Sequence, residues 1–145
     1  MELPDDLLEG ATLRGREYGW PPSVFPAIVA RAQEHGLGCL GGQFQFRVPR
    51  ATCEMYWLNA DPSTRSSDEP WPQYVARTCT EVLAGFRHLL KSTDFRAEAA
   101  RWADVPELSG PSASPEQYLC FVAYFVEQGA APNNSSKPTP LRGAA

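Results

Sequence analysis

The chain has 145 residues and a net charge of −4, and 43% of its residues are hydrophobic. This length and composition predict one globular domain with a core of its own. The negative charge and the lack of any basic run argue against a nucleic-acid-binding protein.

The chain shows no signal for export or membrane insertion. Residues 1–9 are acidic and lack the basic-then-apolar layout of a signal peptide. No apolar run reaches the length that spans a bilayer. We therefore expect a cytoplasmic protein that has no membrane partner.

The first elements are expected to be short. Residues 4–9 are compatible with one helical turn, and residues 12–18 with an edge strand. The segment Tyr18-Gly-Trp-Pro-Pro follows and carries two large aromatic side chains, Tyr18 and Trp20. Aromatic residues in such a loop either anchor it to the core or form part of a binding surface.

A helix is predicted from about Ser23 to His35, because apolar residues recur there at helical spacing. Ser23 suits the N-cap, and Pro26 falls in the first turn, where proline is tolerated. Gly36 suits the left-handed position that ends a helix.

Residues 37–59 predict a β-hairpin around which the remaining elements are organised. Polarity alternates with a period of two, and Pro49-Arg50-Ala51 supplies the turn. Gly41-Gly42 indicates a bulge or a close approach of another backbone. One face is expected to be apolar, with Phe44, Phe46, Met55 and Trp57. The other is expected to be an open polar face, with Gln43, Gln45, Arg47, Glu54 and Tyr56.

A polar loop over residues 59–70 connects the hairpin to the longest predicted helix, residues 70–91. The loop carries charges of both signs, from Asp61, Arg65, Asp68 and Glu69. Long loops are either solvated connections or recognition elements. The helix has a continuous apolar stripe and is expected to pack across the apolar face of the hairpin.

Two further helices are predicted, over residues 93–102 and 115–128. Ser114-Pro115-Glu116-Gln117 has the capping pattern of a helix start. The fold class is therefore α+β, a small antiparallel sheet built on a central hairpin and packed by three to four helices. We expect a single domain over residues 1–129 and a disordered tail over 130–145, where Pro, Asn, Ser, Gly and Ala dominate.

No motif identifies a catalytic residue, a metal site or a cofactor. The two histidines, His35 and His88, have no cysteine or carboxylate at metal-ligand spacing in a suitable element. The four cysteines lie in apolar patterns and are predicted to be reduced, buried and structural: Cys39, Cys53, Cys79 and Cys120. No nucleophile elbow or phosphate-binding loop occurs.

Several segments together resemble small bacterial proteins of one functional type. These segments are Glu-Tyr-Gly-Trp-Pro at 17–21, Cys-Leu-Gly-Gly-Gln-Phe-Gln-Phe at 39–46, Cys-Glu-Met-Tyr-Trp-Leu at 53–58 and Trp-Pro-Gln-Tyr-Val at 71–75. In size and texture, residues 10–105 resemble the immunity proteins that accompany polymorphic or secretion-delivered toxins. The resemblance implies an acidic α+β protein that binds a toxin domain and blocks its active site.

On this hypothesis the partner is a cognate toxin domain with a basic cleft, and the acidic side chains speed association by electrostatic steering. The aromatic residues would be binding hot spots. The predicted contact residues are Tyr18, Trp20, Gln43, Gln45, Arg47, Glu54, Tyr56, Asp61, Arg65, Asp68 and Glu69.

Two alternatives stay open. One is a small enzyme with a carboxylate-centred site, in which Glu54 pairs with Asp61 or Glu69 in a pocket between the hairpin and the long helix. The other is a structural subunit that self-associates through the predicted 115–128 helix. The protein would accordingly be a monomer or a homodimer.

Overall fold

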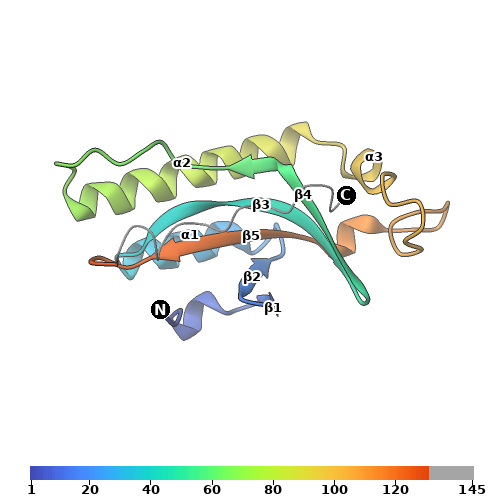
Figure 1. The fold of residues 1–145 in the computed structure, drawn as a ribbon, viewed down its shortest axis with the longest axis horizontal. Coiled ribbons are helices and arrows are strands. Elements are labelled where there is room, and N and C mark those ends of the chain that lie inside the picture. Colours follow the sequence, from blue (N-terminus) through green and yellow to red (C-terminus); the bar gives the residue numbers. More distant parts are fainter. Residues whose placement is uncertain (131–145) are drawn as a thin grey trace.

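The computed structural model describes residues 1–130, which form one antiparallel sheet with helices on one of its faces (Figure 1). The strands are β1 (Thr12–Arg14), β2 (Glu17–Trp20), β3 (Gly38–Val48), β4 (Ala51–Ala60) and β5 (Leu119–Val126). The helices are α1 (Phe25–Glu34), α2 (Trp71–Ser92) and α3 (Phe95–Ala99), with 3-10 turns at Asp5–Leu7 and Pro115–Tyr118. The strand order is β1-β2-β5-β3-β4, which confirms the α+β class.

The predicted hairpin is confirmed as β3 and β4. Phe44 pairs with Met55, whereas the neighbouring Gln43 pairs with Asn59, so residues 56–58 bulge out of the ladder. The close backbone approach expected at the glycine pair is also present. A Cβ atom on Gly42 would overlap the carbonyl oxygen of Val122 on β5.

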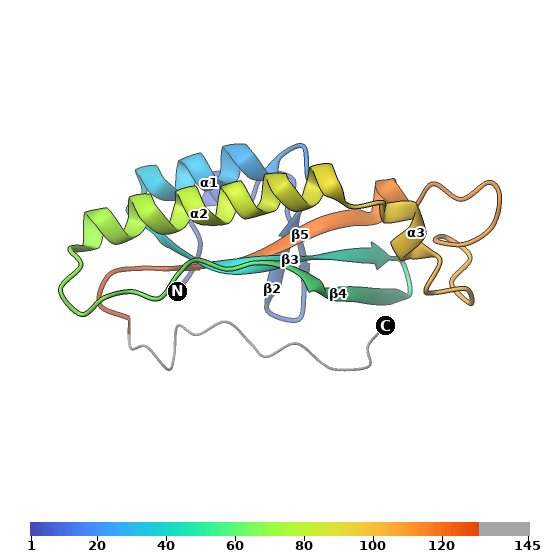
Figure 2. The same ribbon diagram turned by 90° about the horizontal axis from the view of Figure 1, so that it is seen from above.

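Helices α1 and α2 lie together on one side of the sheet (Figure 2). Phe44 of β3 stacks on Phe86 of α2 at 5.5 Å between ring centroids, and Phe121 of β5 lies 4.9 Å from Phe44. Phe25 of α1 joins the same cluster, 4.8 Å from Phe86. The long helix therefore packs across the apolar face of the hairpin, as predicted.

The predicted helix over residues 115–128 is wrong. Its capping pattern starts only the 3-10 turn Pro115–Tyr118, and the chain then forms strand β5. Strand β5 pairs with β3 from Leu119 to Val126 and with β2 at Phe121 and Val122. The helix through which the structural-subunit alternative would self-associate is therefore not formed, and the described residues contain three α-helices. Of the predicted disordered tail, all but Ala130 lies outside the described residues.

The β1–β2 ribbon crosses the sheet and projects on the side away from α1 and α2 (Figure 2). Gly19 of β2 sits so close to that face that an added Cβ would lie 3.2 Å from the guanidinium carbon of Arg47. Consequently the polar face of β3 is not open, and that prediction is wrong. Gln43, Gln45 and Arg47 are only 4%, 1% and 8% exposed.

Candidate functional site

Trp20, predicted as a contact residue, belongs to the core. It is fully buried at the end of β2, and its indole Nε1 donates a hydrogen bond to the carbonyl oxygen of Leu7 at 2.7 Å. Tyr18 is half-buried, with its ring 6.3 Å from that of Trp20. The sequence allowed two roles for this aromatic segment, an anchor to the core or a binding surface. Trp20 is an anchor, because a fully buried ring cannot reach a partner.

Arg47 ties the β1–β2 ribbon to the polar face of the sheet. Its Nη1 donates to the carbonyl oxygen of Thr12 at 2.7 Å, and its Nη2 donates to that of Glu17 at 2.9 Å. Its Nε donates to the side chain of Gln45 at 2.8 Å. Burial lowers the pKa of the Arg47 guanidinium, yet an arginine stays charged because its ordinary pKa is so high. The Arg47 guanidinium is therefore hydrogen-bonded within the fold and is not exposed for contact with a partner.

Glu17 and Tyr124 form a polar pair that the sequence did not indicate as a site. The Tyr124 hydroxyl donates a short hydrogen bond to the Glu17 carboxylate, between β5 and β2. Burial, together with this bond, raises the pKa of Tyr124, so the phenol stays protonated. The alternation of Glu17 and Gly19 with Tyr18 and Trp20 was the signal that could have placed Glu17 on this face.

Glu54 lies on the same face of the sheet as this pair. Its neighbours Cys53 and Met55 are buried in the core beneath the helices, and Glu54 points the opposite way by strand alternation. It therefore does not lie between the hairpin and α2, where the enzyme alternative placed a pocket. The location predicted for a site centred on Glu54 is therefore wrong.

The loop between β4 and α2 is held by a bidentate ion pair. Arg77 of α2 contacts the Glu69 carboxylate through Nε at 2.7 Å and through Nη2 at 2.9 Å. These hydrogen bonds hold the pKa of Glu69 below its usual range and raise that of Arg77. The Glu69 side chain is 5% exposed, so its predicted role as an exposed contact is wrong.

Two further contacts fix the same loop. The backbone N–H and the hydroxyl of Ser63 donate to the Glu81 carboxylate at 2.8 and 2.9 Å. The Arg65 guanidinium stacks over the rings of Trp71 and Tyr74, at 5.3 and 5.0 Å from their centroids. The predicted contact residues Asp61, Arg65 and Asp68 are exposed on this fixed loop.

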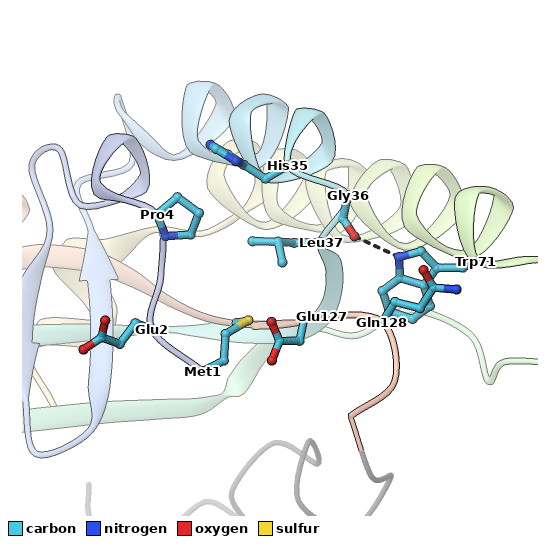
Figure 3. A pocket seen from close by; sticks show the side chains of 9 residues that line it. All are labelled: Met1, Glu2, Pro4, His35, Gly36, Leu37, Trp71, Glu127 and Gln128. Atoms are coloured by element: carbon cyan, nitrogen blue, oxygen red, sulfur yellow. Dashed lines mark hydrogen bonds between the residues drawn. The ribbon is translucent and has the colours of Figure 1, made fainter.

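A cavity of about 390 Å³ lies beside Trp71 (Figure 3). It is lined by Met1, Glu2, Pro4, His35, Gly36, Leu37, Trp71, Glu127 and Gln128. None of these is among the contact residues predicted from the sequence. A second cavity, of about 540 Å³, lies at the hairpin turn between residues 48–51 and 104–107.

All four cysteines lie in the described residues and are buried thiols, as predicted. Burial raises the pKa of Cys79 and of Cys120 to about 11, so neither thiol is activated as a nucleophile. Over residues 1–130, no three His, Cys, Asp or Glu side chains lie close enough together to hold a metal ion. In the same residues, no helix has the length and apolarity needed to cross a bilayer.

Comparisons with protein-family models, curated proteins and solved structures found no match to this chain.

Proposed function

We propose that this protein is a protein-binding inhibitor of the immunity type, which neutralises a bacterial toxin in the cytoplasm by direct contact. The proposal rests mainly on the structure of the loop over residues 61–70. It has no helix or strand, yet the Glu69–Arg77 pair and the Arg65 stack hold it in one conformation. A loop that is ordered before binding loses less conformational entropy on association.

The exposed side chains of the loop fit a basic partner. Asp61 and Asp68 present carboxylates at the surface, and the chain as a whole has a net charge of −4. Glu54 and Tyr56, also predicted as contact residues, lie on β4, the strand that leads into the loop, and both are partly buried. Charge complementarity of this kind raises the association rate and selects the partner.

The proposal is tested with the tagged full chain on a lysate of the source organism. A stoichiometric partner that carries a toxin domain is expected, and co-expression of this chain should restore growth of cells that produce that domain. Asp68→Lys should then weaken the purified complex about tenfold or more, as expected for a charge reversal in an interface.

The matched control is Asp104→Lys, which makes the same charge change at an exposed residue beside the hairpin turn. It should leave the affinity unchanged. Failure to retain or neutralise any toxin domain would overturn the proposed function. Equal affinities of the two variants would remove the loop from the contact surface.

A further inference from the structure

We infer that the cavity beside Trp71 is an anchor pocket for a lysine or arginine side chain of the protein partner. This inference rests on the proposed function and names the chemistry that the partner must present. The cavity volume of about 390 Å³ falls within the usual range for ligand sites and accommodates one long side chain. Its lining combines apolar side chains with two glutamates, of which Glu127 lies beside Met1 and Glu2 points away from the other lining side chains (Figure 3).

The walls suit the hydrocarbon stem of a basic residue. Leu37, 5% exposed, and Pro4 supply aliphatic surface, and the half-buried Trp71 supplies an aromatic wall. Lysine and arginine bury their methylene stems on such surface while the charged group stays near water. Trp71 is held in place because its Nε1 donates to the carbonyl oxygen of Gly36 at 2.9 Å.

The lining holds two carboxylates, those of Glu2 and Glu127, together with the α-amino group of Met1. Glu2 and Glu127 are exposed, and neither forms an ion pair with another described residue. The one lining side chain that can carry a positive charge, His35, already contacts the Asp6 carboxylate at 2.8 Å. Within residues 1–130, no cationic side chain pairs with Glu2 or Glu127, and their two carboxylates outnumber the α-amino group of Met1. An incoming ammonium or guanidinium would therefore meet a net negative charge.

Trp71 links the cavity to the proposed contact surface. Trp71 forms one wall of the cavity, and the same indole ring carries the Arg65 guanidinium of the 61–70 loop. A partner that contacts the loop can therefore place a side chain in the cavity without a second, separate interface. Trp and Arg are also the residue types that most often dominate binding energies at protein interfaces.

The test uses short blocked peptides, so it requires no identified toxin. Acetyl-Gly-Arg-Gly-amide is titrated into the full-length ¹⁵N-labelled protein, and the matched peptide replaces arginine by its neutral isostere citrulline. We expect the arginine peptide to shift the signals of the Trp71 indole and of the Leu37 and Gln128 amides, with a dissociation constant on the order of millimolar. The citrulline peptide should bind measurably more weakly.

Two variants test whether the arginine peptide binds in this cavity. Glu127→Gln should weaken binding of the arginine peptide about threefold, the range of one exposed ion pair. Asp104→Asn, with the same charge change at the hairpin turn, should not alter binding. Equal shifts with both peptides, no shift at Trp71, or unchanged affinity in Glu127→Gln would overturn the anchor pocket. A toxin partner that binds normally to Glu127→Gln would likewise overturn it and leave the proposed function intact.

Discussion

Arg77 and Glu69 join helix α2 to the loop that precedes it through two parallel hydrogen bonds, of 2.7 and 2.9 Å. Their side chains are 23% and 5% exposed, so the carboxylate is largely withdrawn from water. A bidentate pair of this kind fixes direction as well as distance. The pair therefore sets the conformation of the 61–70 loop, on which the proposed function depends.

Arg77→Ala is expected to loosen this loop, because Glu69 would be left buried without its cation. Amide hydrogen exchange over residues 63–69 should accelerate about tenfold, on the scale of one lost hydrogen bond to a charged group. Arg87→Ala is the control, since Arg87 is exposed on the same helix. Unchanged exchange in Arg77→Ala would show that the ion pair does not order the loop.

The loop should also lose order in acid. The pKa of Glu69 is lowered by its hydrogen bonds from Arg77, and that of Glu81 by its hydrogen bonds from Ser63. A carboxylate with a lowered folded-state pKa stabilises the fold above its ordinary pKa and loses this contribution as the pH falls through the lowered value. The protection of the loop amides, measured relative to their intrinsic exchange rates at each pH, should therefore fall below about pH 4.3, the ordinary value for glutamate. Glu69→Gln should flatten this pH dependence, and an unflattened profile would contradict the assignment.

Gly42→Ala is expected to be severely destabilising. The added methyl group would overlap the Val122 carbonyl oxygen and lie 2.5 Å from the Phe121 ring, and neither can move without disturbing the β3–β5 ladder. We expect the free energy of unfolding to fall by about 3 kcal/mol or more. Gly15→Ala is the control, because Gly15 has φ +61° but open space around it, and it should cost about 1 kcal/mol. Urea denaturation measures both, and similar losses would refute the steric argument.

The misassigned strand β5 shows where sequence patterns fall short. Residues 119–126 are apolar on both faces, which is equally typical of a buried helix and of a buried central strand. Their aromatic and β-branched content favours a strand, but the capping pattern at Ser114 pointed to a helix. Pairing with β2 and β3, which are distant in sequence, decided the outcome.

The prediction of an open polar face on the hairpin is wrong for a related reason. Alternation correctly placed Gln43, Gln45 and Arg47 on the side away from the helices. It could not show that the β1–β2 ribbon folds over them, because that contact joins segments about 30 residues apart, as in the bond from Arg47 to Glu17. Likewise, the charges of the 61–70 loop were visible in the sequence, but the burial of Glu69 depends on Arg77 one element later.

The thiols should resist modification in the folded protein. All four are buried, and burial raises the pKa of Cys79 and of Cys120 to about 11. Since the thiolate is the reactive species, a disulfide reagent at pH 8 should label the native chain slowly and the urea-unfolded chain rapidly, at four thiols. Rapid labelling of the native protein would show that one of these sites opens readily.

Trp20→Phe separates an anchoring role from a binding role. The replacement removes the indole N–H that bonds the Leu7 carbonyl oxygen at 2.7 Å and leaves a smaller ring in a fully buried site. We expect the free energy of unfolding to fall by about 2–3 kcal/mol, from the unsatisfied carbonyl group and the cavity together. Trp57→Phe is the control, because Trp57 is only half-buried and its Nε1 bond to Glu98 is longer, at 3.2 Å. That variant should lose about 1 kcal/mol. If Trp20→Phe kept full stability in urea denaturation but lost affinity for a toxin domain, Trp20 would be a contact residue after all.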